Sequence, residues 1–213
     1  MKTVCSVALL LSALLSSAAF AASPSYKIVD RIKVPDGGFD YATFDPATGH
    51  VLMARTDFTT VIDVKSRTVT ARYKLDGCRG ASGLAYATQT KLLISSCGNG
   101  MAKVLQADTG KEVASIPIAR GPDAVIYDPV RQLAFIPCGG DGVLEVISVS
   151  DPAHISLVQQ LTTEMGSRTG TIDPQSGRLY LMASKPDPAG TPGPGGRGIA
   201  RVPGTYEVLV IAP

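Results

Sequence analysis

Short apolar runs that alternate with polar residues follow one another through most of the chain. Runs of four to six residues rich in Val, Ile, Leu and Thr are separated by turn sequences such as Asp-Thr-Gly, Lys-Ser-Arg and Ser-Asp-Pro. A two-residue period of this kind is typical of antiparallel strands joined by hairpins. No stretch after residue 21 keeps the 3.6-residue apolar period of a helix. The pattern therefore predicts an all-β fold.

The alternation is organised in a repeat. Each copy opens on Gly and continues with an apolar-alternating run, a turn and a second apolar run. The copies read "GGFDYATFDPATGHVLMA" at 37–54, "GASGLAYATQTKLLISS" at 80–96, "GPDAVIYDPVRQLAFIP" at 121–137 and "GSRTGTIDPQSGRLYLM" at 166–182. The residues before the turns, Phe44, Tyr86, Tyr127 and Ile172, are 42, 41 and 45 positions apart. Four strands in each unit at a period near 42 are typical of the blades of a β-propeller.

We therefore predict one β-propeller repeat domain over residues 22–213, with four repeats of four-stranded antiparallel blades. The units lie at about 37–77, 78–119, 120–164 and 165–213. The segment "YKIVDRIKV" at 26–34 alternates like a strand but belongs to no unit, so we expect it to close the last blade and hide both sheet edges. Residues 186–197, rich in Pro and Gly, are expected to form a loop inside the last blade.

The first 21 residues have the layout of a secretory signal peptide. Lys2 precedes an apolar stretch from Val4 to about Leu15, and small residues follow as far as Ala21. The apolar stretch is short for a bilayer span, and no other segment could cross a membrane. We therefore predict that residues 1–21 are removed and that the protein is periplasmic or secreted.

Composition argues against several other classes of function. The formal net charge is only +2, and the basic residues are interleaved with acidic ones, so no nucleic-acid partner is indicated. The chain contains no Trp, which disfavours stacking of bases or of quinone-like cofactors. It also lacks a Gly-x-Ser-x-Gly nucleophile elbow and a phosphate-binding loop. We expect no cofactor and no catalytic residue.

Several segments together resemble the secreted YncE-like, or YVTN-type, β-propeller family. They are "GPDAVIYDP", "LQADTGKEVASIPI", "SGLAYATQTKLLISSCGNG" and "VPGTYEVLVIAP". The resemblance covers essentially all of residues 26–213, although "LMAR", "LISS" and "FIPC" stand where the family has its naming tetrapeptide. It implies a propeller architecture more strongly than any activity.

The family usually has seven blades, whereas this chain has four repeats. Three arrangements are open at this point: a closed four-bladed ring, a symmetric dimer that completes an eight-bladed ring, and a truncated form. A ring built from strands that suit a larger propeller would leave a sheet edge open. An open edge predicts a homo-oligomer.

Polar residues recur at equivalent places in the repeat. In a propeller, the loops that lead into the innermost strands and the loops that join the second and third strands lie on one face, around the mouth of a central channel. The expected ligand-binding residues at this mouth are Asp40, Arg55, Asp57, Ser82, Asn99, Asp123, Asp141 and Arg168. Turn chemistry alone explains each Asp or Asn singly. Their coincidence at equivalent positions favours a polar binding site.

The sequence thus favours a non-catalytic scaffold that binds a partner protein or a small ligand at the channel mouth. The alternative is a metal-dependent hydrolase of lactone type with a divalent cation. That alternative is weaker, because Asp40 and Asp123 supply too few oxygen ligands and no glutamate falls at a mouth position. We expect no metal site.

Three cysteines remain after residue 21, which allows at most one disulfide within the chain. Cys78 precedes the innermost strand of the second unit and Cys97 ends the next strand, a placement compatible with a disulfide between them. Cys138 is then left free. A bond between Cys97 and Cys138 across the channel is the alternative.

Overall fold

The computed structural model describes residues 27–190 and 200–213. Residues 1–31 and residues 32–213 form separate units, and the described part of the first, residues 27–31, contains no strand or helix. The predicted signal peptide at 1–21 and residues 191–197 of the predicted loop lie outside the described residues. In the described part of the chain, no helix is long and apolar enough to cross a bilayer.

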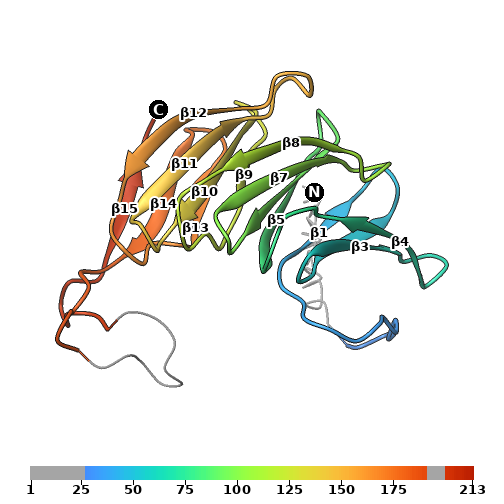
Figure 1. Cartoon of the computed structure of the whole chain (residues 1–213), viewed down its shortest axis with the longest axis horizontal. Helices are drawn as coiled ribbons and strands as arrows, with labels where there is room; N and C mark the ends of the chain where they lie inside the picture. The colour runs from blue at the N-terminus through green and yellow to red at the C-terminus, as the bar shows by residue number, and fades with distance from the viewer. Residues whose placement is uncertain (1–26, 191–199) are drawn as a thin grey trace, which may run out of the picture. The chain divides into compact units, whose positions relative to one another are not determined.

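Residues 32–213 fold into four antiparallel sheets whose strands are hydrogen-bonded in chain order (Figure 1). The first sheet contains β1 (Ala42–Asp45), β2 (His50–Ala54), β3 (Phe58–Asp63) and β4 (Thr68–Lys74). The second contains β5 (Ala81–Ala87), β6 (Leu92–Cys97), β7 (Met101–Gln106) and β8 (Glu112–Pro117). The third contains β9 (Ile126–Asp128), β10 (Leu133–Cys138), β11 (Val143–Ser148) and β12 (Ser156–Thr162). The fourth contains β13 (Gly170–Asp173), β14 (Arg178–Ala183) and β15 (Glu207–Ile211). The predicted all-β, propeller-like fold with four repeats is confirmed.

The sheets follow one another through their first strands. The strand β1 packs beside β5, β5 beside β9, and β9 beside β13 (Figure 1). No comparable packing joins the fourth sheet to the first among the described residues. The sheets therefore form an open series, and the ring is not closed within one chain.

The core is divided into layers between neighbouring sheets. One apolar cross-strand pair recurs in register in every sheet: Leu52 with Val61, Ile94 with Val104, Phe135 with Val146, and Tyr180 with Val210. The first three pairs are buried in clusters that include side chains of the following sheet. The repeat in the sequence therefore produces three similar interfaces, because one face of each sheet covers the next.

A β-bulge also recurs between the third and fourth strands. The register shifts at Val61/Ile62, Val104/Leu105 and Val146/Ile147, which are equivalent places in the first three sheets. A bulge increases the local twist of a strand. The three complete sheets thus share an irregularity at the same place before their outer strand.

The prediction that residues 26–34 close the last sheet is wrong for the residues that the structure describes. Residues 27–34 form no strand, and the fourth sheet ends at β15 with three strands. Within the described residues, no packing comparable to that between neighbouring sheets joins the first sheet to the fourth, and the segment that leads into β1 adds no strand to β15. Val208 and Val210 of β15 are 49% and 60% exposed because no further sheet covers their face in the described part of the chain, whereas the third strands of the other sheets are mostly buried.

The Asp-Pro turns of the repeat owe their regularity to the aspartate side chain. In three sheets this side chain accepts a hydrogen bond from the backbone N–H two residues further on. The pairs are Asp45 with Ala47 at 2.9 Å, Asp128 with Val130 at 2.8 Å, and Asp173 with Gln175 at 3.0 Å. Such a bond fixes a turn without further help from the backbone.

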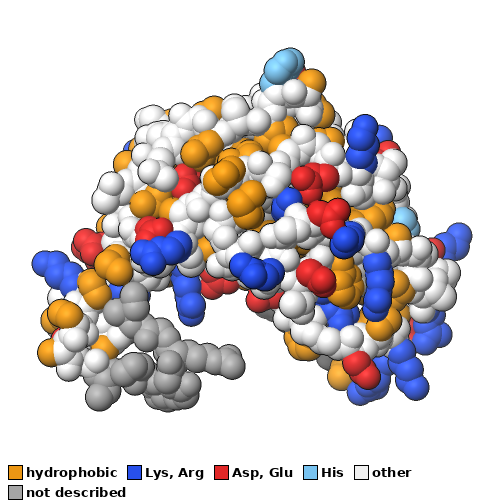
Figure 2. Space-filling model, in the orientation of Figure 1, with side chains coloured by type: hydrophobic (Ala, Val, Ile, Leu, Met, Phe, Trp, Pro, Cys, Tyr) orange, Lys and Arg blue, Asp and Glu red, His pale blue; other side chains and the backbone are white. Residues whose placement is uncertain are grey.

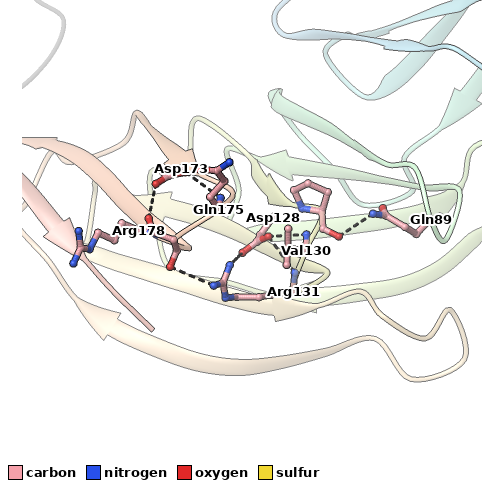
Figure 3. A network of polar contacts seen from close by, with 9 residues as sticks. Gln89, Asp128, Val130, Arg131, Asp173, Gln175 and Arg178 are labelled. Carbon is pink, nitrogen blue, oxygen red and sulfur yellow. Dashed lines mark hydrogen bonds and ion pairs between the residues drawn. The ribbon is translucent and has the colours of Figure 1, made fainter.

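Figure 3 shows that these turns are also joined from sheet to sheet. Arg131 donates from Nη1 to Asp128 Oδ2 at 3.0 Å and from Nη2 to the carbonyl oxygen of Ser176 at 3.2 Å. Gln89, from the second sheet, donates to the carbonyl oxygen of Pro129 at 2.8 Å. The second, third and fourth sheets are therefore tied together at this end.

Candidate functional site

A disulfide fixes the end of the second sheet that faces the predicted mouth. Cys78 and Cys97 are bonded, with their Cα atoms 5.4 Å apart, and this is the pair expected from the strand placement. Cys138 is free and buried. Burial, helped by the nearby charges of Glu145 and Asp141, raises the pKa of the Cys138 thiol to about 12. Cys138 therefore stays a protonated thiol at neutral pH and is a poor partner for disulfide exchange.

We predict that replacing both Cys78 and Cys97 by serine lowers the free energy of unfolding by about 2 to 3 kcal/mol, because the disulfide closes a loop over a sequence separation of 19 residues. Urea denaturation measures the loss. A reducing agent should destabilise the natural chain by a similar amount and leave the double variant unchanged. A further loss in the reduced double variant would contradict this assignment of the bond.

Two residues expected at the mouth, Asn99 and Asp141, are instead hydrogen-bonded to the loop that precedes the first strand of their own sheet. Asn99 accepts a hydrogen bond from the backbone N–H of Arg79 and donates to the carbonyl oxygen of Gly77, both at 2.9 Å. Asp141 occupies the equivalent place in the third sheet, where it accepts from the backbone N–H of Arg120 at 2.7 Å and from its guanidinium at 2.6 Å. These bonds with Arg120 hold the pKa of Asp141 below its ordinary value. Both side chains therefore join two loops at the same end of their sheet.

Arg55 and Asp57 lie on the loop after β2, beside the backbone of Asp40, whose N–H donates to the carbonyl oxygen of Ala54 at 3.1 Å. Arg55 is only 2% exposed; it donates from Nη2 to the carbonyl oxygen of Pro35 at 3.0 Å. Its guanidinium carbon lies 5.5 Å from the ring centre of Phe58, a cation–π contact. Its Nε and Nη1 atoms have no hydrogen-bond partner within the described part of the chain. Asp57 is exposed on the turn between β2 and β3.

Four side chains gather where the first strands of three sheets begin. Asp40 and Tyr41 lie directly before β1, Asp123 lies shortly before β9, and Arg168 lies shortly before β13. Arg168 Nε is 3.4 Å from Asp123 Oδ2. Asp40 is near enough for its charge to act on both Asp123 and Tyr41. We call Asp40, Tyr41, Asp123 and Arg168 the inner-end cluster.

Burial shifts two acids of this cluster. The pKa of Asp123 is raised because burial disfavours the carboxylate; Arg168 opposes this shift and Asp40 adds to it. The pKa of Tyr41 is raised by burial and then by the charges of Asp123 and Asp40, against Arg168. The side chain of Asp123 is nevertheless 26% exposed. The inner-end cluster thus presents two carboxyl groups, a phenol and a guanidinium at a partly exposed position.

The backbone of Asp123 and Ala124 is hydrogen-bonded both to the second sheet and to the segment that precedes β13. Ser82 and Ser96 of the second sheet donate from their hydroxyls to the carbonyl oxygen of Asp123, at 3.2 and 3.0 Å. On the other side, the backbone N–H of Ala124 donates to the carbonyl oxygen of Arg168 at 3.2 Å. Ser82, expected at the mouth, therefore positions Asp123.

The structure thus brings together three of the eight predicted mouth residues, with Ser82 supporting them. Sequence reasoning missed Tyr41 and Ser96. An available signal for Tyr41 was its position: it is an aromatic residue between Asp40 and the first strand of the repeat. Ser96 carried no such signal, because its role depends on how closely the second and third sheets approach.

A pocket of about 260 Å³ lies away from the inner-end cluster, between the third and fourth sheets. Its lining is largely apolar and includes Leu133, Phe135, Leu144, Leu161, Leu179 and Ile211. The fourth sheet has no outer strand to place opposite β12, so apolar surface remains open there. A ligand-binding pocket usually combines an apolar lining with a few convergent polar groups, and those groups are found at the inner-end cluster instead. We therefore attribute this pocket to the missing strand.

In the described part of the chain, neither candidate metal ligands nor the charges on the face in Figure 2 form a second candidate site. Within residues 27–190 and 200–213, no group of three or more His, Cys, Asp or Glu is placed to hold a metal ion. On the face seen in Figure 2, basic and acidic side chains are interspersed. That face therefore carries no continuous basic surface.

Comparison with known proteins supports the fold alone. No family model and no curated protein matches the chain. Among solved structures, hydrazine synthase from Kuenenia stuttgartiensis is similar, with a TM-score of 0.66 and 16% sequence identity over 88% of this chain. The match covers 49% of the hydrazine synthase chain, so this chain spans about half of its length. A likeness at this identity is consistent with a propeller-like fold and assigns no activity.

Proposed function

We propose that this chain is an exported β-propeller scaffold that binds a small ligand at the inner-end cluster without transforming it. The observation that carries the proposal is the position of Asp123. Its carboxyl group is partly exposed, has a raised pKa, and lies between Arg168 and the charge of Asp40 on a backbone held by two other sheets. Groups fixed before binding lose little freedom when a ligand arrives.

The chemistry of the inner-end cluster suits a small zwitterion. The carboxyl groups of Asp40 and Asp123 match a ligand ammonium group, and the 62% exposed side chain of Arg168 matches a ligand carboxylate. The two carboxyl groups outnumber the one guanidinium, so an ammonium group would relieve an existing repulsion. Burial is the main cause of the raised pKa of Asp123; Arg168 opposes the shift, and the charge of Asp40 adds a smaller contribution in the same direction as burial.

The free amino acids are suitable probes, followed by NMR of the backbone amides. We expect shifts at residues 40, 41, 123 and 168, and binding at least about tenfold weaker in Asp123→Asn, since a hydrogen bond to a charged group contributes about 1.5 to 3 kcal/mol. Binding should strengthen as the pH rises through the raised pKa of Asp123, because only the ionised carboxylate attracts the ammonium group.

Asp57→Asn is the matched control, since Asp57 is an exposed aspartate on the loop between β2 and β3 and does not belong to the inner-end cluster. It should bind the probes as the natural chain does. Equal binding by Asp123→Asn, or amide shifts confined to other residues, would show that the inner-end cluster is not the binding site.

A further inference from the structure

The outer face of the fourth sheet repeats a surface that is buried in the other three. At the position where Val61, Val104 and Val146 are 1%, 0% and 6% exposed, Val210 is 60% exposed. Its neighbours on the same face, Met182 and Val208, are 47% and 49% exposed and lie opposite each other in register. In each earlier sheet this face packs on the sheet that follows. No sheet follows the fourth among the described residues.

The first sheet presents the matching surface. In the three internal interfaces, the third-strand valine shares a cluster with the residue that ends the apolar run of the next first strand: Val61 with Tyr86, Val104 with Tyr127, and Val146 with Ile172. The equivalent residue in the first sheet is Phe44, which is 52% exposed. The first sheet has no preceding sheet among residues 32–213 to cover it. In the described part of the chain, both surfaces of the repeated interface are therefore exposed, one on the first sheet and the other on the fourth.

We propose that two copies of this chain associate head to tail, with the fourth sheet of each copy packed on the first sheet of the other. The contact would repeat the three interfaces already present within the chain, with Val210 against Phe44 of the second copy. A head-to-tail contact gives a ring where the rotation closes and a filament where it does not. Four sheets from each copy make eight, which lies within the range of known propeller rings.

This inference is independent of the ligand proposed above, and its first test is the mass of the full chain in solution. Light scattering coupled to size exclusion should give twice the monomer mass. Val210→Lys and Phe44→Glu should each raise the dissociation constant of the dimer by at least about a hundredfold, because each places an unpaired charge in both copies of an apolar contact. Val158→Lys is the matched control, since Val158 is 54% exposed on β12, outside this face. It should remain dimeric.

Mixing the two interface variants separates this arrangement from other dimers. A mixed pair has one natural contact and one contact in which the introduced lysine meets the introduced glutamate, so an equimolar mixture should regain the dimer. Circular dichroism of each variant alone should match the natural chain. A monomeric natural chain, a filament that grows with concentration, or a Phe44→Glu variant that still dimerises would each overturn the proposal.

Discussion

Replacing Asp128 by alanine is expected to lower the free energy of unfolding by about 3 kcal/mol or more. The Asp128 side chain is fully buried and accepts hydrogen bonds from the backbone N–H groups of Val130 and Arg131 at 2.8 and 3.1 Å. It also accepts from the guanidinium of Arg131 at 3.0 Å. Without Asp128, these three partly buried donors lose an acceptor that is itself fully buried. Urea denaturation followed by circular dichroism measures the loss.

Asp63→Ala is a close control for this variant. Asp63 holds a turn in the same way, accepting from the backbone N–H groups of Lys65 and Ser66, but these bonds lie at the surface. Water can replace the lost acceptor there, so Asp63→Ala should destabilise the chain far less than Asp128→Ala does. If the two variants lost equal free energies of unfolding, burial at Asp128 would not be the reason why its loss is costly.

The aspartate of this turn also shows what the sequence could and could not predict about the fold. The Asp-Pro repeat and the two-residue alternation predict the sheets, because strand period and turn chemistry are local properties. The outer strand of the fourth sheet could not be predicted in the same way. Residues 26–34 alternate like a strand, but a strand needs an edge to pair with, and whether β15 offers that edge depends on ring closure.

The candidate site, too, could be predicted only in part from the sequence. Equivalence in the repeat predicts that Asp40, Asp123 and Arg168 lie at corresponding places, and the structure brings them together. The repeat does not reveal which of these side chains are already hydrogen-bonded within the protein. Asn99 and Asp141 have the same surroundings in the sequence pattern as free mouth residues, yet they are bonded to the loops beside them. Those bonds depend on turn geometry, which the residue types alone do not determine.

Gly83→Ala is the second variant expected to have a large effect, because a side chain at this position would enter the neighbouring sheet. A Cβ atom on Gly83 would contact the carbonyl oxygen of Asp123 and lie 2.7 Å from the nitrogen of Val125 and 2.8 Å from the carbonyl carbon of Ala124. All three are backbone atoms, so no side-chain rotation can make room. We expect a loss of about 3 kcal/mol or more in the free energy of unfolding, the upper end of the usual cost of overpacking.

Gly98→Ala separates this steric effect from the general cost of changing a glycine. Gly98 lies at the end of the same sheet, where an added Cβ would be 3.4 Å from the carbonyl oxygen of Arg79, an ordinary contact. Gly98→Ala should therefore unfold at nearly the natural urea concentration.

The two glycines also differ in their connection to the inner-end cluster. The segment that a Cβ on Gly83 would displace carries Asp123, and Ser96, which accepts from the backbone N–H of Gly83 at 3.0 Å, is bonded to the same carbonyl oxygen. Displacing that segment should move the Asp123 carboxyl group relative to Arg168 and expose it. Its pKa should then fall towards the ordinary value for aspartate, because burial is the main cause of the raised value. NMR titration of Asp123 in Gly83→Ala measures this change, and an Asp123 pKa as high as in the natural chain would show that the approach of the second sheet does not set the environment of Asp123.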